Sequence, residues 1–315
     1  MKRLNWNSIE MPLFPWVRTV ERIIRAQRPP DLRGPIINIF SDYSGDNKQS
    51  PYEVISILYF DLAASMEWEY RRREIRRRYL KDGRRMSFKS LGDRQRQRAL
   101  IPFLQAANDI HGMCVSVAIK KSIKVLCSDE ALFTALIDRL QFETKWKYRA
   151  FERMLRVSHL ISVLIAGLSN PGQHIYWMSD EDALHANMHR SKDLGYMLSL
   201  YTSFYVKHQL GELGLGTTAL DEGDRYEEDA AAIADLAAGA VAEILQRVSA
   251  AAGGKVRPRI AIPFDDEFSP KTEVLCSWLS DESQKLRRAT IVFEQEEKGT
   301  YSVSRFDIEI GRAHV

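Results

Sequence analysis

Two aspartates of this sequence follow short apolar segments, a position at which carboxylates can form a metal site. Asp42 lies two residues beyond the apolar run 36–40, and Asp180 lies two residues beyond the run 174–178. If both runs are strands of one sheet, the side chains that follow them lie where α/β sheets bind ligands. Paired carboxylates repel each other, and a hard cation such as Mg²⁺ or Mn²⁺ removes that repulsion. The alternative for each aspartate is loop solubility or helix capping.

A third carboxylate lies inside a segment of small residues. Asp235 interrupts the run AAIADLAAGA in a predicted alanine-rich helix, 225–248, and a buried carboxylate is unfavourable without a partner. Glu228 precedes Asp235 by seven residues and therefore shares its helical face. The acidic patch at 221–229 favours a helix start, because the helix dipole stabilises negative charge there. Asp235 is a candidate ligand, and the alternative is that it faces solvent.

Positive charge is concentrated in one segment. Positions 66–98 hold thirteen Lys or Arg and five acids, a local charge of +8, whereas the whole chain carries only +3. Clustered arginines beside an acidic metal site are typical of proteins that hold a phosphate backbone, and Trp68, Tyr70 and Tyr79 could stack on unpaired bases. The alternative is a solvated helix that pairs with acidic helices of this chain or of a partner protein. Six arginines fall within eight positions: Arg71, Arg72, Arg73, Arg76, Arg77 and Arg78.

Hydrophobic periodicity and turn residues predict the elements that would position these side chains. Strands separated by helices indicate an α/β fold, and the short loop between the first two strands indicates a mixed sheet. Strands are predicted at 36–40, 53–61, 113–119 and 174–178, with a strand or extended loop at 213–220. Helices are predicted at 16–28, 66–80, 94–108, 129–168 (as two helices), 194–210 and 225–248, and a β-α-β-β unit at 256–308.

Composition limits the class of protein. With 45% hydrophobic and 28% charged residues in 315, the chain can bury a sizeable core. Positions 1–15 lack the apolar core of a signal peptide, and the most apolar run, 161–168, is far shorter than the ~20 residues of a membrane span. We therefore expect a cytoplasmic protein without membrane association. Three cysteines without C-x-x-C spacing favour buried free thiols. Residues 309–315 resemble a translated sequencing adaptor and are excluded from functional reasoning.

The stretches INIFSDYSGD and AIADLAAGAV resemble two motifs of a bacterial family, domain of unknown function 3800. The first is similar to the family's opening strand, which ends in Asp-Glu-Ser-Gly. The second is similar to its late helix, which carries an Ala-Asp-Leu-(Val/Ala)-Ala-Gly pattern. The order of elements between them also agrees, over roughly residues 35–248. The resemblance implies a ribonuclease-H-like fold and an acidic metal site with Asp42, Asp180 and Asp235 as ligands.

Two further positions take their interpretation from this resemblance. Tyr43 stands where the family has a glutamate. If that glutamate is a ligand, this site has lost one, and Glu181, Asp182 or Glu228 could replace it. A lysine at the end of the third strand is common in the family, so Lys120 would approach the site and a phosphate. The alternative is a strand-end lysine that stays in water.

The predicted architecture is an α/β protein with a ribonuclease-H-like mixed sheet flanked by helices, and with a small C-terminal α/β appendage. The ribonuclease-H-like domain is expected at 35–250, after a helical extension at 1–34. The appendage is expected at 256–308, before the expected non-native tail at 309–315.

Two functional hypotheses follow. The first is a Mg²⁺- or Mn²⁺-dependent nuclease acting on RNA or DNA phosphodiesters. Asp42, Asp180, Asp235 and Lys120 would be the catalytic residues, and the three aspartates would bind metal with Glu228. Lys120 and the arginine cluster would hold the backbone. The second is a catalytically degenerate ribonuclease-H-like module that binds nucleic acid or a partner protein, for example in a phage-defence or mobile-element system.

Overall fold

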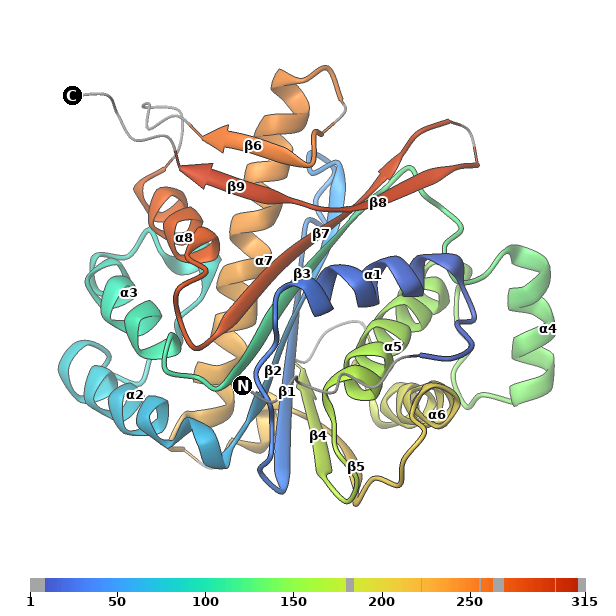
Figure 1. Cartoon of the computed structure of the whole chain (residues 1–315), viewed down its shortest axis with the longest axis horizontal. Helices are drawn as coiled ribbons and strands as arrows, with labels where there is room; N and C mark the ends of the chain where they lie inside the picture. Colours follow the sequence, from blue (N-terminus) through green and yellow to red (C-terminus); the bar gives the residue numbers. More distant parts are fainter. Residues whose placement is uncertain are drawn as a thin grey trace.

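The computed structural model describes residues 9–179, 184–221, 223–254, 256–262, 269–297 and 299–310. Within these ranges the chain forms strands and helices in a mixed order (Figure 1). The strands are β1 (Ile36–Ser44), β2 (Tyr52–Asp61), β3 (Gly112–Lys120), β4 (His174–Ser179), β5 (Leu213–Thr217), β6 (Arg259–Ile262), β7 (Arg287–Gln295), β8 (Tyr301–Arg305) and β9 (Asp307–Ile310). The α-helices are α1 (Pro15–Ala26), α2 (Met66–Tyr79), α3 (Arg94–Ala107), α4 (Glu130–Leu140), α5 (Tyr148–Leu168), α6 (Met188–Tyr205), α7 (Tyr226–Ala251) and α8 (Pro270–Ser280).

Seven of these strands form one mixed sheet in the order β5-β4-β1-β2-β3-β7-β8. β1, β2 and β3 form an antiparallel meander, whereas β4 pairs in parallel with β1 and β5 in parallel with β4. Among the first five strands, β2 alone therefore runs against the others. This arrangement confirms the predicted α/β class and is consistent with a ribonuclease-H-like sheet.

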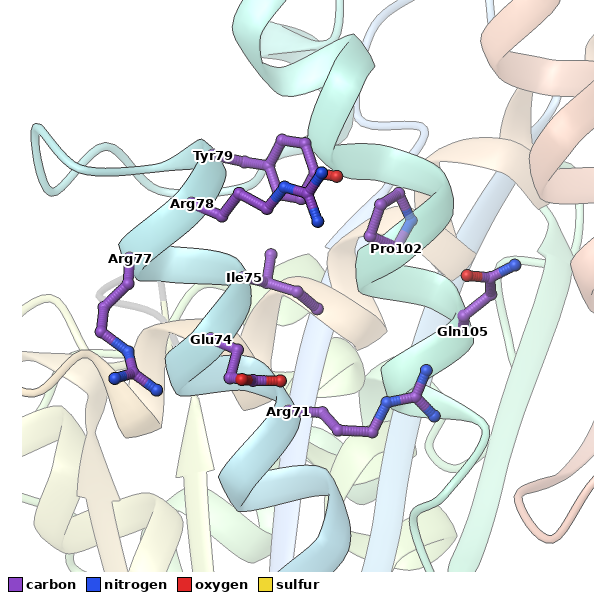
Figure 2. Close-up of a pocket in the computed structure, with 8 residues that line it drawn as sticks. All are labelled: Arg71, Glu74, Ile75, Arg77, Arg78, Tyr79, Pro102 and Gln105. Atoms are coloured by element: carbon purple, nitrogen blue, oxygen red, sulfur yellow. The ribbon is translucent and has the colours of Figure 1, made fainter.

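Helices cover both faces of the sheet. α2, α3, α7 and α8 lie on one face, and α1, α5 and α6 lie on the other (Figure 1). α2 and α3 pack side by side (Figure 2). β1 shows why two layers are needed. Ile37 and Ile39 pack in the cluster around α5, whereas Phe40 packs in the cluster around α7, because neighbouring residues of a strand point to opposite faces.

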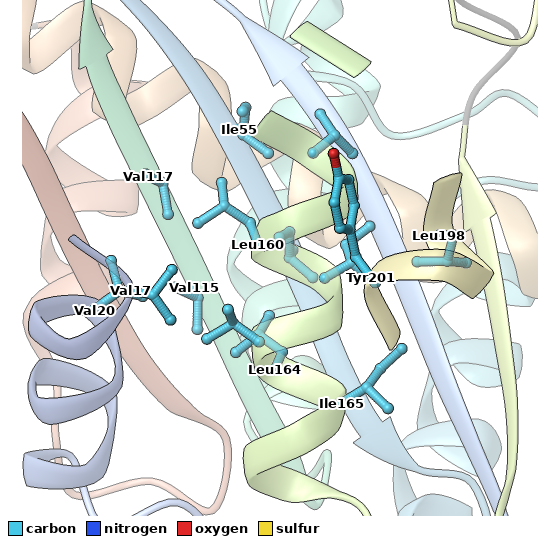
Figure 3. Packing of buried hydrophobic residues seen from close by; sticks show 14 of the residues in the cluster. Val17, Val20, Ile55, Val115, Val117, Leu160, Leu164, Ile165, Leu198 and Tyr201 are labelled. Carbon is cyan, nitrogen blue, oxygen red and sulfur yellow. The ribbon is translucent and has the colours of Figure 1, made fainter. Parts of the chain in front are cut away.

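The larger core lies between the sheet and α5. Val115 and Val117 of β3 and Ile55 of β2 meet Leu160 and Leu164 of α5 (Figure 3). Nearly every residue of α5 from position 151 onward is buried. A helix is buried on nearly all sides where other elements surround it, and α5 lies between the sheet, α1 and α6.

On the opposite face, α7 packs along the sheet, and many of its buried residues are alanines. Tyr226 in its first turn accepts a 2.8 Å hydrogen bond from the Asn38 amide, and its ring centroid is 6.3 Å from that of Phe40. Near its other end, Ile244 packs in a cluster with Tyr52 of β2. α7 thus follows β1 along its length and then crosses toward β2 and β3.

Two boundaries differ from the sequence prediction in ways that affect the site. β1 continues past residue 40, because its pairing with β2 extends to Ser44↔Val54, so Asp42 lies in a strand and not in a loop. The segment expected as an appendage is only partly separate. β7 pairs with β3 and β8 with β7, which extends the main sheet, while β6 and β9 form a two-stranded sheet of their own. β9 includes positions 309 and 310 of the predicted tail.

Other predictions concern single features. The first and second halves of 129–168 form α4 and α5, as expected. α6 begins earlier than predicted, because the Asn187 side chain caps its first turn by accepting from the Arg190 N–H. The three cysteines are buried and free. In the described part of the chain, no helix has the length and apolar character needed to cross a bilayer.

Candidate nucleic-acid interface and acidic site

Asp42 is the first residue of β1 beyond its parallel pairing with β4, which ends at Ser41↔Ser179. On its other side, Asp42 is the Cα partner of Ser56 in β2, and Ser56 pairs with Ser116 in β3. The two serine hydroxyls are hydrogen-bonded at 2.7 Å. By strand alternation all three side chains lie on the face that α7 covers. A polar row that includes the half-buried Asp42 therefore crosses the sheet between two apolar clusters.

Asp180, the second predicted ligand, lies outside the described residues, as do Glu181 and Asp182. β4 is described up to Ser179, whose Cα partner is Ser41. Among the residues that the structure describes, no three His, Cys, Asp or Glu side chains gather in a group that could hold a metal ion. Of the predicted ligands, the structure therefore describes Asp42, Asp235 and Glu228.

Tyr43 points to the face of the sheet opposite to Asp42. Its ring packs against the cluster around α5, and its hydroxyl forms a 3.1 Å hydrogen bond with Ser41 Oγ. The guanidinium of Arg153 lies 4.8 Å from the centroid of that ring. Tyr43 consequently contributes to the α5 layer rather than to the face on which Asp42 lies.

Asp235, the third predicted ligand, binds the link between α2 and α3. Its Oδ2 accepts a 2.6 Å hydrogen bond from the backbone N–H of Phe88. Gly239 lies one turn later on α7 and leaves room for the Phe88 ring, because a Cβ at position 239 would be 2.2 Å from Phe88 Cγ. The Asp-Leu-Ala-Ala-Gly pattern thus has a packing role in this chain, because Asp235 and Gly239 hold the α2–α3 link against α7.

The orientation of Asp235 separates it from the sheet. Tyr226 contacts β1, and Ala237 lies on the same helical face because the two are eleven positions apart. Asp235 is two positions from Ala237, which places it about 200° away around the helix. Its carboxylate therefore projects from the side of α7 opposite to the one that covers β1. Its role as a ligand beside Asp42 stays a prediction, and this orientation argues against it.

Lys120 is engaged at the far end of β3. Its ammonium forms an ion pair with Glu294 of β7 and donates to the carbonyl of Gly254. It also lies 5.8 Å from the ring centroid of Tyr52, whose hydroxyl donates to the same Glu294. Lys120 is four residues beyond Ser116, the β3 member of the polar row, so it lies about 13 Å along the sheet from that row. In this structure Lys120 therefore stabilises the pairing of β3 with β7.

The arginines of α2 fall into two sets, and the inner set, Arg72 and Arg76, lies at the interface with α7. The Arg72 side chain is 0% exposed, and its guanidinium donates at 2.9 Å to Glu69 and to both carboxylate oxygens of Asp224. Arg76 makes a bidentate pair with Asp229 at 2.6 and 2.7 Å. Burial opposes the charge of Arg72, but the hydrogen bond and charge of Glu69, with the nearby aspartates, raise its pKa above the ordinary value.

Glu228, predicted as an additional ligand, belongs to the same interface. Its carboxylate accepts a 2.6 Å hydrogen bond from Arg225 and lies 3.9 Å from guanidinium nitrogens of Arg76 and Arg85. Three cationic groups thus surround one anion. This geometry assigns Glu228 to the ion-pair network that holds α2 and the following link on α7.

The outer set of α2 arginines faces solvent. Arg77 and Arg78 are exposed, and within the described ranges neither forms an ion pair. The guanidinium of Arg78 lies 5.3 Å from the ring centroid of Tyr79. Arg71 and Arg73 are partly exposed and pair with acids of the chain at the surface. Ion pairs in that position contribute about 0–1 kcal/mol, so these arginines can exchange their partners for phosphate.

The sequence interpretation placed all six arginines in one binding surface and did not separate the inner set. A signal for that set was present, because the acids that Arg72 and Arg76 bind belong to the acidic patch at 221–229. Arginines that cover more than one face of a helix cannot all face solvent once that helix packs on a layer. A basic helix and an acidic patch in one chain therefore predict a mutual contact.

Comparison with protein-family models and with curated proteins finds no match for this chain. The strand order supports the fold class, as described above. The functional argument accordingly rests on the position of Asp42 and on the division of the α2 arginines.

Proposed function

We propose that this protein is a Mg²⁺- or Mn²⁺-dependent nuclease of the domain of unknown function 3800 family, acting on RNA or DNA in the cytoplasm. The observation that carries the proposal is the register of β1 and β4. These parallel neighbours are paired as far as Ser41 and Ser179, and the next residue of each segment is an aspartate, Asp42 and Asp180. Parallel strand ends of this kind are where α/β sheets bind ligands.

The donor chemistry at this position fits a hard divalent cation. Asp42 offers carboxylate oxygens at a half-buried place, in the same row as the hydroxyls of Ser56 and Ser116. Such oxygen donors suit Mg²⁺ and Mn²⁺ better than softer metals. Held by Asp42 and Asp180, the ion would stabilise negative charge on the phosphate and lower the pKa of water.

The exposed cations of the chain hold the substrate in this proposal. Arg77 and Arg78, with Arg71 and Arg73 beside them, present guanidinium groups that can donate two parallel hydrogen bonds to a phosphate. The inner set of arginines, Glu228 and Lys120 act in stability instead, because each is bound within the chain.

A cleavage assay on labelled RNA, DNA and hybrid strands with Mg²⁺ or Mn²⁺ tests the proposal. Asp42→Asn keeps the size of the side chain and removes its charge, and it should lower the cleavage rate by about 100-fold or more. Asp46→Asn is the matched control, because Asp46 is exposed in the loop after β1 and pairs with Arg153 at 3.1 Å. It should cleave like the wild type. Wild-type rates in Asp42→Asn would overturn the proposal.

Binding of nucleic acid or a partner protein without cleavage is a second candidate function, favoured by the contacts of Asp235. Because that carboxylate accepts from Phe88 and points away from the sheet, the site would have fewer acidic ligands than the resemblance implies. Strand binding with no cleavage in either metal would support this second function. Cleavage that Asp42→Asn abolishes would support the first.

A further inference from the structure

A groove opens between the outer sides of α2 and α3. Its volume is about 550 Å³. Figure 2 shows Arg71 and Arg78 of α2 along one wall, and Pro102 and Gln105 of α3 along the other. This groove is distinct from the row that contains Asp42, because it lies on the far side of the α2–α3 layer from the sheet.

The charges that line the groove favour an anion. Arg71, Arg77 and Arg78 contribute three cations, and Glu74 contributes one carboxylate. Arg71 forms an ion pair with Asp109, whereas Arg77 and Arg78 have no acidic partner in the part of the chain that the structure describes. Figure 2 shows that Arg78 points toward α3 and the groove, whereas Arg77 lies on the other side of α2, so one guanidinium group faces the groove and a second lies beside it.

Between these cations the groove has an apolar surface. Ile75, Tyr79 and Pro102 line it, and Ile75 belongs to the core cluster beneath. Gln105 adds an amide that can both donate and accept hydrogen bonds. An inorganic anion would use only the guanidinium groups. A ligand that combines a phosphate with a flat heterocycle would use the cations, the apolar surface and the amide together.

The groove is formed by helices with fixed positions. The inner set of arginines anchors the opposite side of α2 to acids at and just before the start of α7. At the end of α2, the carbonyl of Tyr79 accepts a 2.7 Å hydrogen bond from the Gln95 amide of α3. Fixed walls lower the ordering cost of binding. Arg98, which is exposed one turn before Pro102, extends the positive charge along α3.

We propose that the groove between α2 and α3 binds one nucleotide unit of a single-stranded nucleic acid. Phosphate oxygens in the groove accept from Arg78, and a neighbouring phosphate of the strand accepts from Arg77 beside the groove. The base covers Ile75 and Pro102, and Gln105 meets the edge of the base. The volume is that of a small-ligand site, and a duplex keeps its bases stacked inside the helix. This inference rests on the nucleic-acid binding proposed above and adds the place, the residues and the single-stranded form.

Strand binding measured by fluorescence anisotropy in EDTA tests the groove without cleavage. The probe is a labelled oligothymidylate, and the variant is Arg77→Ala/Arg78→Ala. The matched control is Arg22→Ala/Arg139→Ala, which removes the same charge from exposed positions on α1 and α4. The groove variant should bind about tenfold more weakly, and its salt slope should fall by about 1.4, at about 0.7 for each single-strand phosphate contact. The control should bind like the wild type.

Competition with unlabelled duplex of the same sequence and with polyglutamate defines the ligand. Weak competition by the duplex and by polyglutamate supports binding of a single-stranded nucleotide unit. If either competes as well as the unlabelled single strand, that assignment is overturned. Equal weakening in the two double variants overturns the groove, because net charge alone would then explain the loss. Absence of wild-type binding to any RNA or DNA strand overturns the proposed nucleic-acid function as well as the groove.

Discussion

The two faces of α2 carry the same residue type in opposite environments. Toward α7, the side chains of Arg72 and Arg76 are 0% and 11% exposed, and both bind acids near the start of that helix. Toward solvent, Arg77 and Arg78 are exposed and line the groove shared with α3. A buried cation must be paired, whereas an exposed one stays available to a partner. The inner set therefore stabilises the fold, and the outer set is the candidate for function.

The acids divide in the same way. Glu228 is surrounded by arginines, and Asp235 holds the Phe88 N–H, so both stabilise the layer of helices. Asp42 instead lies at the end of the β1–β4 pairing, in a row with serine hydroxyls. Residue type and spacing alone do not separate these two groups, because the separation depends on what each side chain faces.

The largest expected effect is on the inner face of α2. Arg72→Ala should lower the free energy of unfolding by about 3–5 kcal/mol, because it leaves the buried Asp229 and its neighbours with one cation fewer. Urea unfolding at neutral pH measures this. An effect below about 1 kcal/mol would show that the inner set is not a buried ion-pair network.

A buried histidine on the other face of the sheet provides a contrast, because its pKa is set by burial. His159 stacks on Tyr201 with ring centroids 3.6 Å apart, its Nδ1 is 3.1 Å from the Tyr205 hydroxyl, and burial lowers its pKa from 6.5 to about 3. Between these values the unfolded chain binds a proton that the folded protein does not, so stability falls as pH decreases. The loss should reach about 2 kcal/mol by pH 5. His159→Phe should remove that part of the pH dependence in urea unfolding, and an unchanged slope would contradict the assignment.

The contact between the α2–α3 link and α7 should contribute less to stability. Gly239→Ala adds a Cβ against the Phe88 ring, and it should cost about 1–2 kcal/mol after the gain in helix propensity is counted. Gly195→Ala in α6 is the matched control, because the nearest atom to its Cβ, in Leu215, is 3.5 Å away. The control should be neutral or stabilising in thermal unfolding. Equal behaviour of the two variants would mean that the link is not seated on Gly239.

The smallest effect on stability is expected on the outer face of α2. Arg77→Ala/Arg78→Ala should change the free energy of unfolding by less than about 0.5 kcal/mol. The same urea titration used for Arg72→Ala checks this. A loss of several kcal/mol would remove the difference between the two faces of the helix.

Much of the fold could be predicted from the sequence, because apolar periodicity and turn residues are local signals. The mixed sheet, the α4–α5 division and the long α7 were all predicted in place. The length of β1 was not, since its extension through Asp42 depends on pairing with β2. The partners of Arg72 and Asp235 could not be assigned either, because Asp224 and Phe88 are about 150 positions away in the chain.

Mn²⁺ binding to the full chain tests most directly the central claim, that Asp42 belongs to a metal site and Asp235 to the packing of the link. The wild type, Asp42→Asn and Asp235→Asn are titrated with Mn²⁺, and the free ion is measured by its electron paramagnetic resonance signal. Asp42→Asn should weaken Mn²⁺ binding at least about tenfold, whereas Asp235→Asn should retain nearly wild-type affinity. Unchanged binding in Asp42→Asn, or an equal loss in Asp235→Asn, would contradict the account.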